Sequence, residues 1–329
     1  MRVTHVVRID AGLYRGGGEI QAERTREALA ALGVDVHVFH PLDREVGDLV
    51  HFFGPFDYYA DVAEHLKVPY VASPIFVTPR TTARLRWRRF RQRFLDFQYP
   101  KKQLRFLRGA KELYPLTELE EANLCAYFGD LPPMHRIPNG VEARFAHGDA
   151  EAFRREFGIA EPFILHTGTI DPSKNQLNLI RAAGTDLRVV ILGRESDPDY
   201  AAKCRATAGA NVTFLAPLPN DSPLFAGAYA AAHVFCLPSY REIFSLSALE
   251  ATVAGAQLVL SNRWGGPAIW GDDAAYVDPD DVAGIRGALE GALSKPRADA
   301  ARSERYLTKY SWEAVAKQLI VRYEAVLRR

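Results

Sequence analysis

The chain alternates short runs of β-branched and aromatic residues with amphipathic segments of helical length from one end to the other. This alternation is typical of βαβ units, in which helices join parallel strands, and it excludes an all-β fold. The length of 329 residues exceeds one ordinary hydrophobic core. We therefore expect an α/β protein of two domains, while one large barrel stays open as the alternative.

The first half predicts an α/β domain over residues 1–145. A helix is expected at residues 19–32, and Gly33 after it suits a helix C-terminus. The turn sequence Pro138-Asn139-Gly140 closes this half. The runs with strand character are residues 4–9, 35–39, 49–53, 70–72, 113–116 and 134–137.

A second α/β domain is expected over residues 146–310. The polar helical segment AEAFRREFG leads into the apolar strand FILHTG, and a new alternation begins there. The last segment, residues 311–329, predicts a helix that is long enough to cross back to the first domain. The expected strands of the second domain are residues 163–166, 188–192, 212–215, 233–237 and 257–260.

Charge and composition narrow the class of partner. The net charge of +1 gives the whole protein no attraction to nucleic acid. Cys125, Cys204 and Cys236 lack metal-ligand spacing, which indicates buried thiols in a reducing compartment. No apolar run approaches the roughly 20 residues of a membrane span, and the N-terminus enters a strand pattern directly. We expect a cytoplasmic protein.

The histidines show no metal-ligand spacing, so the sequence assigns no metal site. His51 and His166 lie at expected strand ends. Each is either a packed core histidine, the commoner case, or a residue that faces a ligand.

The most informative segment is PSYREIFSLSALEA, residues 238–251, which predicts a strand end, a turn and a helix start. Ligands of open α/β sheets bind beyond the carboxyl ends of strands, and a helix start offers unpaired N–H groups to a diphosphate. Glu242 precedes the helix and Glu250 lies about two turns along it, so their carboxylates can accept hydroxyl hydrogen bonds from two sides of one ligand. The alternative is that Glu242 caps the helix and Glu250 is solvated.

This segment resembles the Glu-x7-Glu motif of retaining glycosyltransferases of the GT-B fold, especially glycosyltransferase family 4. The resemblance implies two facing Rossmann-like domains, with a nucleotide-sugar donor in the second and an acceptor in the first. Further landmarks follow in the family's order, namely GGGEIQAERTREALAALGVDVHVF, RIPNGVEARF, HTGTIDPSKNQLNLIRAA, NVTFLAPL, LFAGAYAAAHVFCLPSYREIF, SNRWGGPAIWGDDAAYVDPDD and SWEAVAKQLIVRYEAVL.

The resemblance implies roles for individual residues. Glu242 would contact donor-sugar hydroxyls, Glu250 would hold the ribose, and Lys174 would stabilise the leaving diphosphate, a role that suits a compact cation. The alternative for Lys174 is a solvated lysine at a helix start. Glu242 and Lys174 are the implied catalytic residues, and the implied donor-binding set is Gly168, Thr169, Lys174, Arg194, Glu242, Ile243, Phe244, Ser245, Leu246 and Glu250.

The sequence departs from the family's pattern at two places. Relatives usually carry an arginine directly after the glycine of the HTG segment, and this chain has Thr169, which cannot neutralise charge. Arg194, Arg241 and Arg263 are candidates for the missing cation. Many relatives also place a histidine after the fourth strand, where this chain reads ASPIF at residues 72–76.

Two features of the first half remain. Gly16, Gly17 and Gly18 precede the first helix and indicate either a plain turn or a flexible loop for a phosphate or the acceptor, without the G-x-G-x-x-G spacing of dinucleotide sites. Residues 80–111 are basic, with aromatic residues interleaved. This stretch suits the surface of an anionic membrane or a helix packed on its own domain, and no RNA-binding motif accompanies it.

Taken with these residues, the resemblance implies a retaining, metal-independent glycosyltransferase that needs no cofactor and moves a sugar to an acceptor hydroxyl, and we expect a role in cell-envelope or polysaccharide glycan synthesis. Glycan, lipid-linked and small-molecule acceptors all stay open. The alternatives are a non-catalytic nucleotide-sugar-binding or partner-docking homologue, and a sugar-nucleotide epimerase of the same fold.

Overall fold

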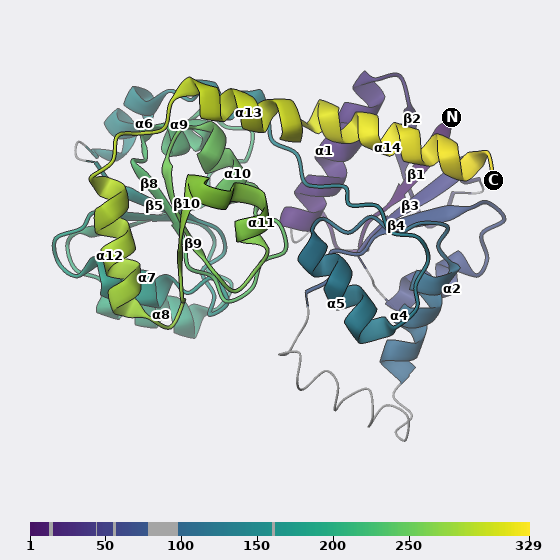
Figure 1. Cartoon of the computed structure of the whole chain (residues 1–329), viewed down its shortest axis with the longest axis horizontal. Helices are drawn as coiled ribbons and strands as arrows, with labels where there is room; N and C mark the ends of the chain where they lie inside the picture. The colour runs from purple at the N-terminus through teal and green to yellow at the C-terminus, as the bar shows by residue number, and fades with distance from the viewer. Residues whose placement is uncertain (13–15, 44, 55–56, 78–97, 160–161) are drawn as a thin grey trace. The chain divides into compact units, whose positions relative to one another are not determined.

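The computed structural model describes residues 1–12, 16–43, 45–54, 57–77, 98–159 and 162–329. Its internal contacts divide the chain into two compact units (Figure 1). Unit 1 comprises Met1–Gly140 together with Trp312–Arg329, and unit 2 comprises Val141–Ser311. Each unit is built on a parallel sheet, so the predicted α/β class with two Rossmann-like domains is confirmed.

Unit 1 contains a four-stranded parallel sheet in the order β2-β1-β3-β4. Every residue of β3 and β4 is buried, because helices cover both faces of the sheet. Its elements are β1 (Arg2–Val6), α1 (Gly17–Ala31), β2 (Asp35–Val38), β3 (Leu49–Phe53), α2 (Asp57–Ala63), β4 (Tyr70–Ser73), α4 (Gln98–Gly109), α5 (Glu118–Phe128) and the C-terminal helix α14 (Trp312–Leu327).

Two apolar clusters hold unit 1 together. On one face α1 and α14 pack against each other, and Leu29, Leu319 and Tyr323 join the buried strand residues Val3 and Leu49. On the other face α2 and α4 pack over a cluster of aromatic rings. Each large side chain buried in this way stabilises the fold by roughly 1.5–3 kcal/mol.

A buried carboxylate holds the loop that follows β4. Glu120 of α5 accepts hydrogen bonds from the backbone N–H groups of Phe76 at 2.7 Å and Leu116 at 2.6 Å. Burial raises the pKa of Glu120 to about 7, although the two backbone hydrogen bonds oppose the shift. The loop segment next to Phe76 includes Ile75, whose φ of +48° is unusual for a β-branched residue.

Unit 2 contains a six-stranded parallel sheet in the order β10-β9-β8-β5-β6-β7. The strand order reverses between β5 and β8, which is the switch point of a doubly wound sheet. Its elements are η1 (Ala143–His147), α6 (Ala150–Phe157), β5 (Ile164–Thr167), α7 (Gln176–Ala183), β6 (Val189–Leu192), α8 (Pro198–Thr207), β7 (Val212–Leu215), α9 (Pro223–Ala231), β8 (Val234–Leu237), α10 (Leu246–Val253), β9 (Gln257–Ser261), α11 (Gly266–Trp270), η2 (Gly271–Asp273), β10 (Ala274–Val277), α12 (Val282–Leu293) and α13 (Ala300–Tyr310).

Local sequence signals fix where the helices of unit 2 begin. Asp197 accepts a hydrogen bond from the third residue of α8, and Ser222 from the second residue of α9, each followed by a proline at the first helical position. Asp281 caps α12 in the same way. Such caps satisfy N–H groups that have no partner inside the helix.

The structure corrects several expected boundaries. The first strand ends at Val6 rather than at residue 9. The expected strands at residues 113–116 and 134–137 are reduced to single parallel bridges, Ala72 to Leu113 and Leu113 to Met134. Strand β10 was not predicted, because two of its four residues are alanine and only Val277 is buried.

Candidate active site

Two loops of unit 2 meet at the carboxyl ends of β5 and β8, the two strands at the switch point. The loop after β5 covers residues 168–175, and the loop after β8 covers residues 238–245. The backbone N–H of Tyr240 donates to the carbonyl of Ser173 at 2.8 Å, which joins the loops directly. This is the place where doubly wound sheets bind their ligands.

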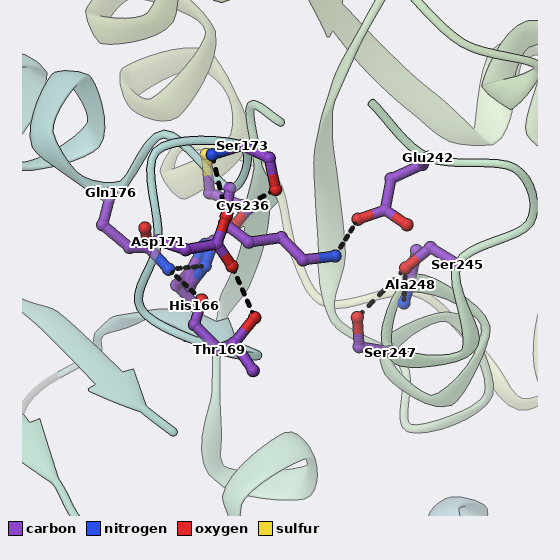
Figure 2. Close-up of polar contacts among 11 residues, drawn as sticks. His166, Thr169, Asp171, Ser173, Gln176, Cys236, Glu242, Ser245, Ser247 and Ala248 are labelled. Atoms are coloured by element: carbon purple, nitrogen blue, oxygen red, sulfur yellow. Dashed lines mark hydrogen bonds and ion pairs between the residues drawn. The ribbon is translucent and has the colours of Figure 1, made fainter. Parts of the chain in front are cut away.

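Lys174 and Glu242 form an ion pair across these loops (Figure 2). Their side chains are only 24% and 13% exposed. Burial by itself would lower the pKa of Lys174, but the Glu242 carboxylate and then Asp171 raise it above its ordinary value. The lysine is therefore charged, and the alternative of a solvated lysine at a helix start is wrong.

Asp171 organises the loop that carries Lys174. Its carboxylate accepts a hydrogen bond from the hydroxyl of Thr169 at 2.6 Å and from the backbone N–H of Ser173 at 2.8 Å (Figure 2). Burial would raise the pKa of Asp171, but hydrogen bonds from Ser173 and Thr169 hold it below its ordinary value. Thr169, at the position where the family resemblance led us to expect an arginine, thus donates to the ionised carboxylate of Asp171 and supplies no cation.

The start of α10 leaves donors open beside the ion pair. Ser245 is the N-cap, and its hydroxyl accepts from the backbone N–H of Ala248 at 3.1 Å. Within the described residues, no acceptor is found for the N–H groups of Leu246 and Ser247. These two groups and the positive end of the helix dipole can bind an anion. Because Ser245 is the cap, the alternative that Glu242 caps the helix is wrong.

Aromatic packing holds the turn between Glu242 and α10 in place. Phe244 is buried, and its ring lies 5.9 Å from that of Trp270 and 5.6 Å from that of Tyr310, measured between centroids. Ile243 is half-buried. This packing fixes the backbone that leads into α10.

Glu250 lies on α10 and is 8% exposed, so the alternative that it is a solvated helix residue is wrong. Its carboxylate interacts with the hydroxyl of Tyr229, which also lies 2.7 Å from the hydroxyl of Thr167. Burial and then Glu250 raise the pKa of Tyr229 well above its ordinary value. Any ligand hydroxyl that reaches Glu250 joins an existing buried polar network.

Glycine is required at two positions near the site. Gly168 has a φ of +141°, a conformation that L side chains seldom adopt. A Cβ atom on Gly193, which follows β6, would lie 1.8 Å from the carbonyl oxygen of Gly168. The sequence pattern did not single out Gly193, because the close approach joins loops that are distant in sequence.

The three arginines proposed as substitutes for the missing cation differ in their surroundings. Arg263 pairs with Asp278 at 2.7 Å and with Asp280, so its charge is already balanced. Arg194 is exposed on the loop after β6, and its carbonyl accepts from the loop after β5. Arg241 is exposed next to Glu242, with no ion pair to any described residue.

Both singled-out histidines are core residues. His166 is fully buried, with Nδ1 2.9 Å from the carbonyl of Cys236, and burial lowers its pKa to about 4. His51 in unit 1 is also buried, with its ring nitrogens 2.6 Å from the hydroxyl of Tyr323 and 2.9 Å from that of Ser73. Neither is placed to exchange protons with a ligand.

The glycine segment of unit 1 is not a flexible loop. Gly17 and Gly18 form the first turn of α1, so the helix begins two residues earlier than expected. The backbone N–H of Gly16 donates to the carboxylate of Glu19 at 2.8 Å, and Glu19 pairs with Arg8 at 2.9 Å. The helix start therefore already has an anionic partner from the chain itself.

Residues 80–97 of the basic stretch lie outside the described residues. In the described remainder, Lys102 pairs with Asp61 at 2.8 Å and Arg105 pairs with Glu64 at 2.7 Å, so acidic residues in and beside α2 balance part of the charge of α4.

The cysteines differ in burial. Cys125 is exposed, against the expectation of a buried thiol, because it lies on the outer face of α5. Cys204 and Cys236 are buried, as expected.

The described residues lack two further features. None of their helices is both long and apolar enough to span a membrane. Their histidine, cysteine and acidic side chains form no group of three or more that could hold a metal ion.

Comparison with known proteins bears on the fold and on unit 2. Residues 149–310 match the sequence model of the family Glycosyl transferases group 1. A sucrose-phosphate synthase (tll1590) from Thermosynechococcus elongatus superposes with a TM-score of 0.78 at 19% identity, over 100% of both chains. The fold is that of the GT-B glycosyltransferases. Anabaena Alr3699/HepE in complex with UDP-glucose has the same fold, with a TM-score of 0.75 at 14% identity over 99% of this chain and 100% of that one.

Curated proteins of similar sequence include D-inositol 3-phosphate glycosyltransferases. The protein from Nocardia farcinica (strain IFM 10152) is 31% identical over 241 residues, which are 66% of this chain and 51% of the relative. The protein from Rhodococcus opacus (strain B4) is 31% identical over 231 residues, 63% of this chain and 51% of the relative. The chain thus matches about half the length of these relatives.

Proposed function

We propose that this protein is a glycosyltransferase that transfers a sugar from a nucleotide-diphosphate sugar to an acceptor hydroxyl. One observation carries the proposal: the ammonium of Lys174 and the carboxylate of Glu242 meet at the switch point of unit 2, beside open N–H groups at the start of α10. The family match over residues 149–310 and the structural likeness to a protein that binds UDP-glucose support it.

The site divides naturally between the two parts of a donor. A diphosphate is anionic and would bind Lys174 and the N–H groups of Leu246 and Ser247. A sugar offers hydroxyl donors, which the Glu242 carboxylate would accept, and a ribose would present its hydroxyls to Glu250. Binding therefore exchanges partners: Lys174 leaves Glu242 for phosphate, and Glu242 turns to the sugar. Lys174 keeps an anionic partner throughout, and the Glu242 carboxylate keeps hydrogen-bond donors.

Transfer with retention of the anomeric configuration is our proposal for the chemistry. The bond from the anomeric carbon to the phosphate oxygen breaks while the acceptor oxygen bonds to the same face of that carbon. The leaving phosphate takes the acceptor proton, so no protein base is needed. Catalysis is then positioning plus stabilisation of negative charge on the diphosphate by Lys174 and helix N–H groups, without a metal ion or other cofactor.

We place the acceptor on unit 1 and the role of the protein in cell-envelope or polysaccharide glycan synthesis. The proposed location is the cytoplasm, with peripheral contact to anionic membrane through residues 80–111. The basic composition of this stretch supports such contact. The pairing of Lys102 and Arg105 with α2 limits how much of that charge a membrane would meet.

The test is an assay of nucleoside diphosphate released from UDP-, GDP- and ADP-glucose, with and without a panel of glycan, lipid-linked and small-molecule acceptors. We expect acceptor-dependent release by the wild type and a loss of at least about a hundredfold in Glu242→Ala. Glu304→Ala, which removes an exposed carboxylate on α13, serves as the matched control and keeps full activity.

Chromatographic identification of the sugar nucleotides in the same incubations, together with a titration of nucleotide binding, separates the alternatives. A donor converted without any acceptor, with an isomeric sugar nucleotide as product, identifies an epimerase and contradicts the proposal. If the protein binds a nucleotide but converts no pair of donor and acceptor, it is the non-catalytic homologue. Thr169, in place of the arginine expected from the resemblance, motivates that alternative. Unchanged activity in Glu242→Ala removes that residue from the site.

A further inference from the structure

Asn175 lies at the start of α7, where the backbone conformation and the side-chain hydrogen bonds each restrict which residue type fits. Its φ of +62° and ψ of +34° lie in the left-handed region, which glycine and asparagine tolerate best. Its side chain is buried, and Nδ2 donates both of its hydrogens, to the carbonyl of Pro238 at 3.0 Å and to that of Pro279 at 2.7 Å. Glycine meets only the backbone demand, and aspartate would bring an oxygen against the two carbonyl oxygens.

The two acceptors belong to different loops at the same edge of the sheet. Pro238 follows β8, Pro279 follows β10, and Asn175 itself ends the loop after β5. One buried amide therefore ties three loops together. When this amide is lost, the Pro279 carbonyl keeps a hydrogen bond from Asn178, but the buried Pro238 carbonyl loses its donor. Because an unpaired buried carbonyl is costly, the loss favours separation of the loop after β8 from the loop after β5.

The tie lies directly beside the residues that would bind a donor. Ser173, Lys174 and Asn175 are consecutive, and each contacts the loop after β8, through a backbone hydrogen bond, an ion pair and a side-chain hydrogen bond. A lysine side chain is long and flexible, so its ammonium stays in place only if its backbone does. The hydrogen bonds of Asn175 fix that backbone from within the protein.

We propose that Asn175 is a positioning residue for donor binding, which holds Lys174 where its ammonium meets the diphosphate. This inference rests on the proposed function. Asn175 does not touch the donor and acts through Lys174. When its amide is removed, Lys174 must be ordered as the nucleotide binds, and affinity falls.

The test compares Asn175→Gly with Asn178→Ala by calorimetric titration with UDP, GDP and ADP. Asn175→Gly keeps the left-handed backbone and removes only the amide. Asn178 donates to the same Pro279 carbonyl at 2.9 Å but does not bond to Pro238, which makes it a matched control. We expect the Kd of the tightest nucleotide to rise about tenfold in Asn175→Gly, the effect of one or two lost hydrogen bonds, and less than about twofold in Asn178→Ala.

A double-mutant cycle distinguishes positioning from a general structural role. In a Lys174→Ala background, Asn175→Gly should have less than about a twofold effect, because the residue through which it acts is gone. Circular dichroism checks that each variant is folded. If Asn175→Gly is not folded, Asn175→Ser, which also removes the amide, takes its place.

Three outcomes contradict these proposals. Wild-type affinity in Asn175→Gly overturns the role of Asn175, and so does a tenfold loss that persists without Lys174. A wild-type protein that binds none of the three nucleotides instead overturns the proposed function, and the role of Asn175 falls with it.

Discussion

Replacing Glu242 with glutamine should make the protein bind a nucleoside diphosphate more tightly while it abolishes transfer. Lys174 already has an anionic partner, Glu242, and a diphosphate must displace it. Glutamine removes the competing charge and leaves a lysine that is largely buried and unpaired. Binding then satisfies that lysine instead of exchanging one partner for another.

The size of the effect follows from the burial of the pair. Exposed ion pairs contribute about 0–1 kcal/mol, and breaking a fully buried pair costs about 3–5 kcal/mol. With side chains 24% and 13% exposed, this pair lies between those limits. A competition of about 1–2 kcal/mol corresponds to roughly 5- to 30-fold tighter binding in Glu242→Gln.

Calorimetric titration with UDP, GDP and ADP at low and at high salt measures this directly. Lys174→Ala should bind more weakly than the wild type, opposite in sign to Glu242→Gln, and Glu304→Gln should be unchanged. The difference between Glu242→Gln and the wild type should shrink in high salt, because screening weakens the competing pair. Equal or weaker nucleotide binding in Glu242→Gln would refute the claim that Glu242 and the diphosphate share Lys174.

Three further predictions follow from the structure. Arg241→Ala should weaken nucleotide binding several-fold in the same titrations and Arg263→Ala should not, because Arg263 is already paired with two carboxylates; equal effects would contradict this. Folding raises the pKa of Glu120 from 4.5 to about 7, so the folded state binds more protons than the unfolded state between these pH values, and the free energy of unfolding should fall by about 3 kcal/mol from pH 4.5 to pH 7. Urea titrations across this pH range should show a flatter dependence on pH in Glu120→Gln. In urea unfolding, Gly193→Ala should destabilise unit 2 by at least about 3 kcal/mol, because its Cβ would clash with a backbone oxygen. Gly287→Ala lies in open space on a helix and should stabilise by about 0.5–1 kcal/mol, so similar values for the two variants would be inconsistent with this packing.

Much of the fold was predictable because it depends on local patterns. The runs VVIL and VFCL are apolar throughout, as buried parallel strands require, and the structure has β6 and β8 there. The helix starts at Asp197-Pro198 and Ser222-Pro223 carry their own caps. Strand β10 escaped prediction because neighbouring elements, rather than its own four residues, define it.

The candidate site was predictable in position and less so in detail. Residue type and spacing placed Glu242 at a loop after a strand, and the family resemblance pointed to Lys174, but no local pattern reveals that the two pair with each other. The role of Thr169 as a donor to Asp171 likewise depends on loop geometry. Asn175 and Gly193 escaped notice because their partners lie dozens of residues away.

A crystal structure of the protein with a bound nucleoside diphosphate tests the central claim most directly. We expect both phosphates within about 3.2 Å of the Lys174 ammonium or of the N–H groups of Leu246 and Ser247, with Glu242 released from the lysine. A nucleotide bound elsewhere, with Lys174 and Glu242 still paired, would contradict the account.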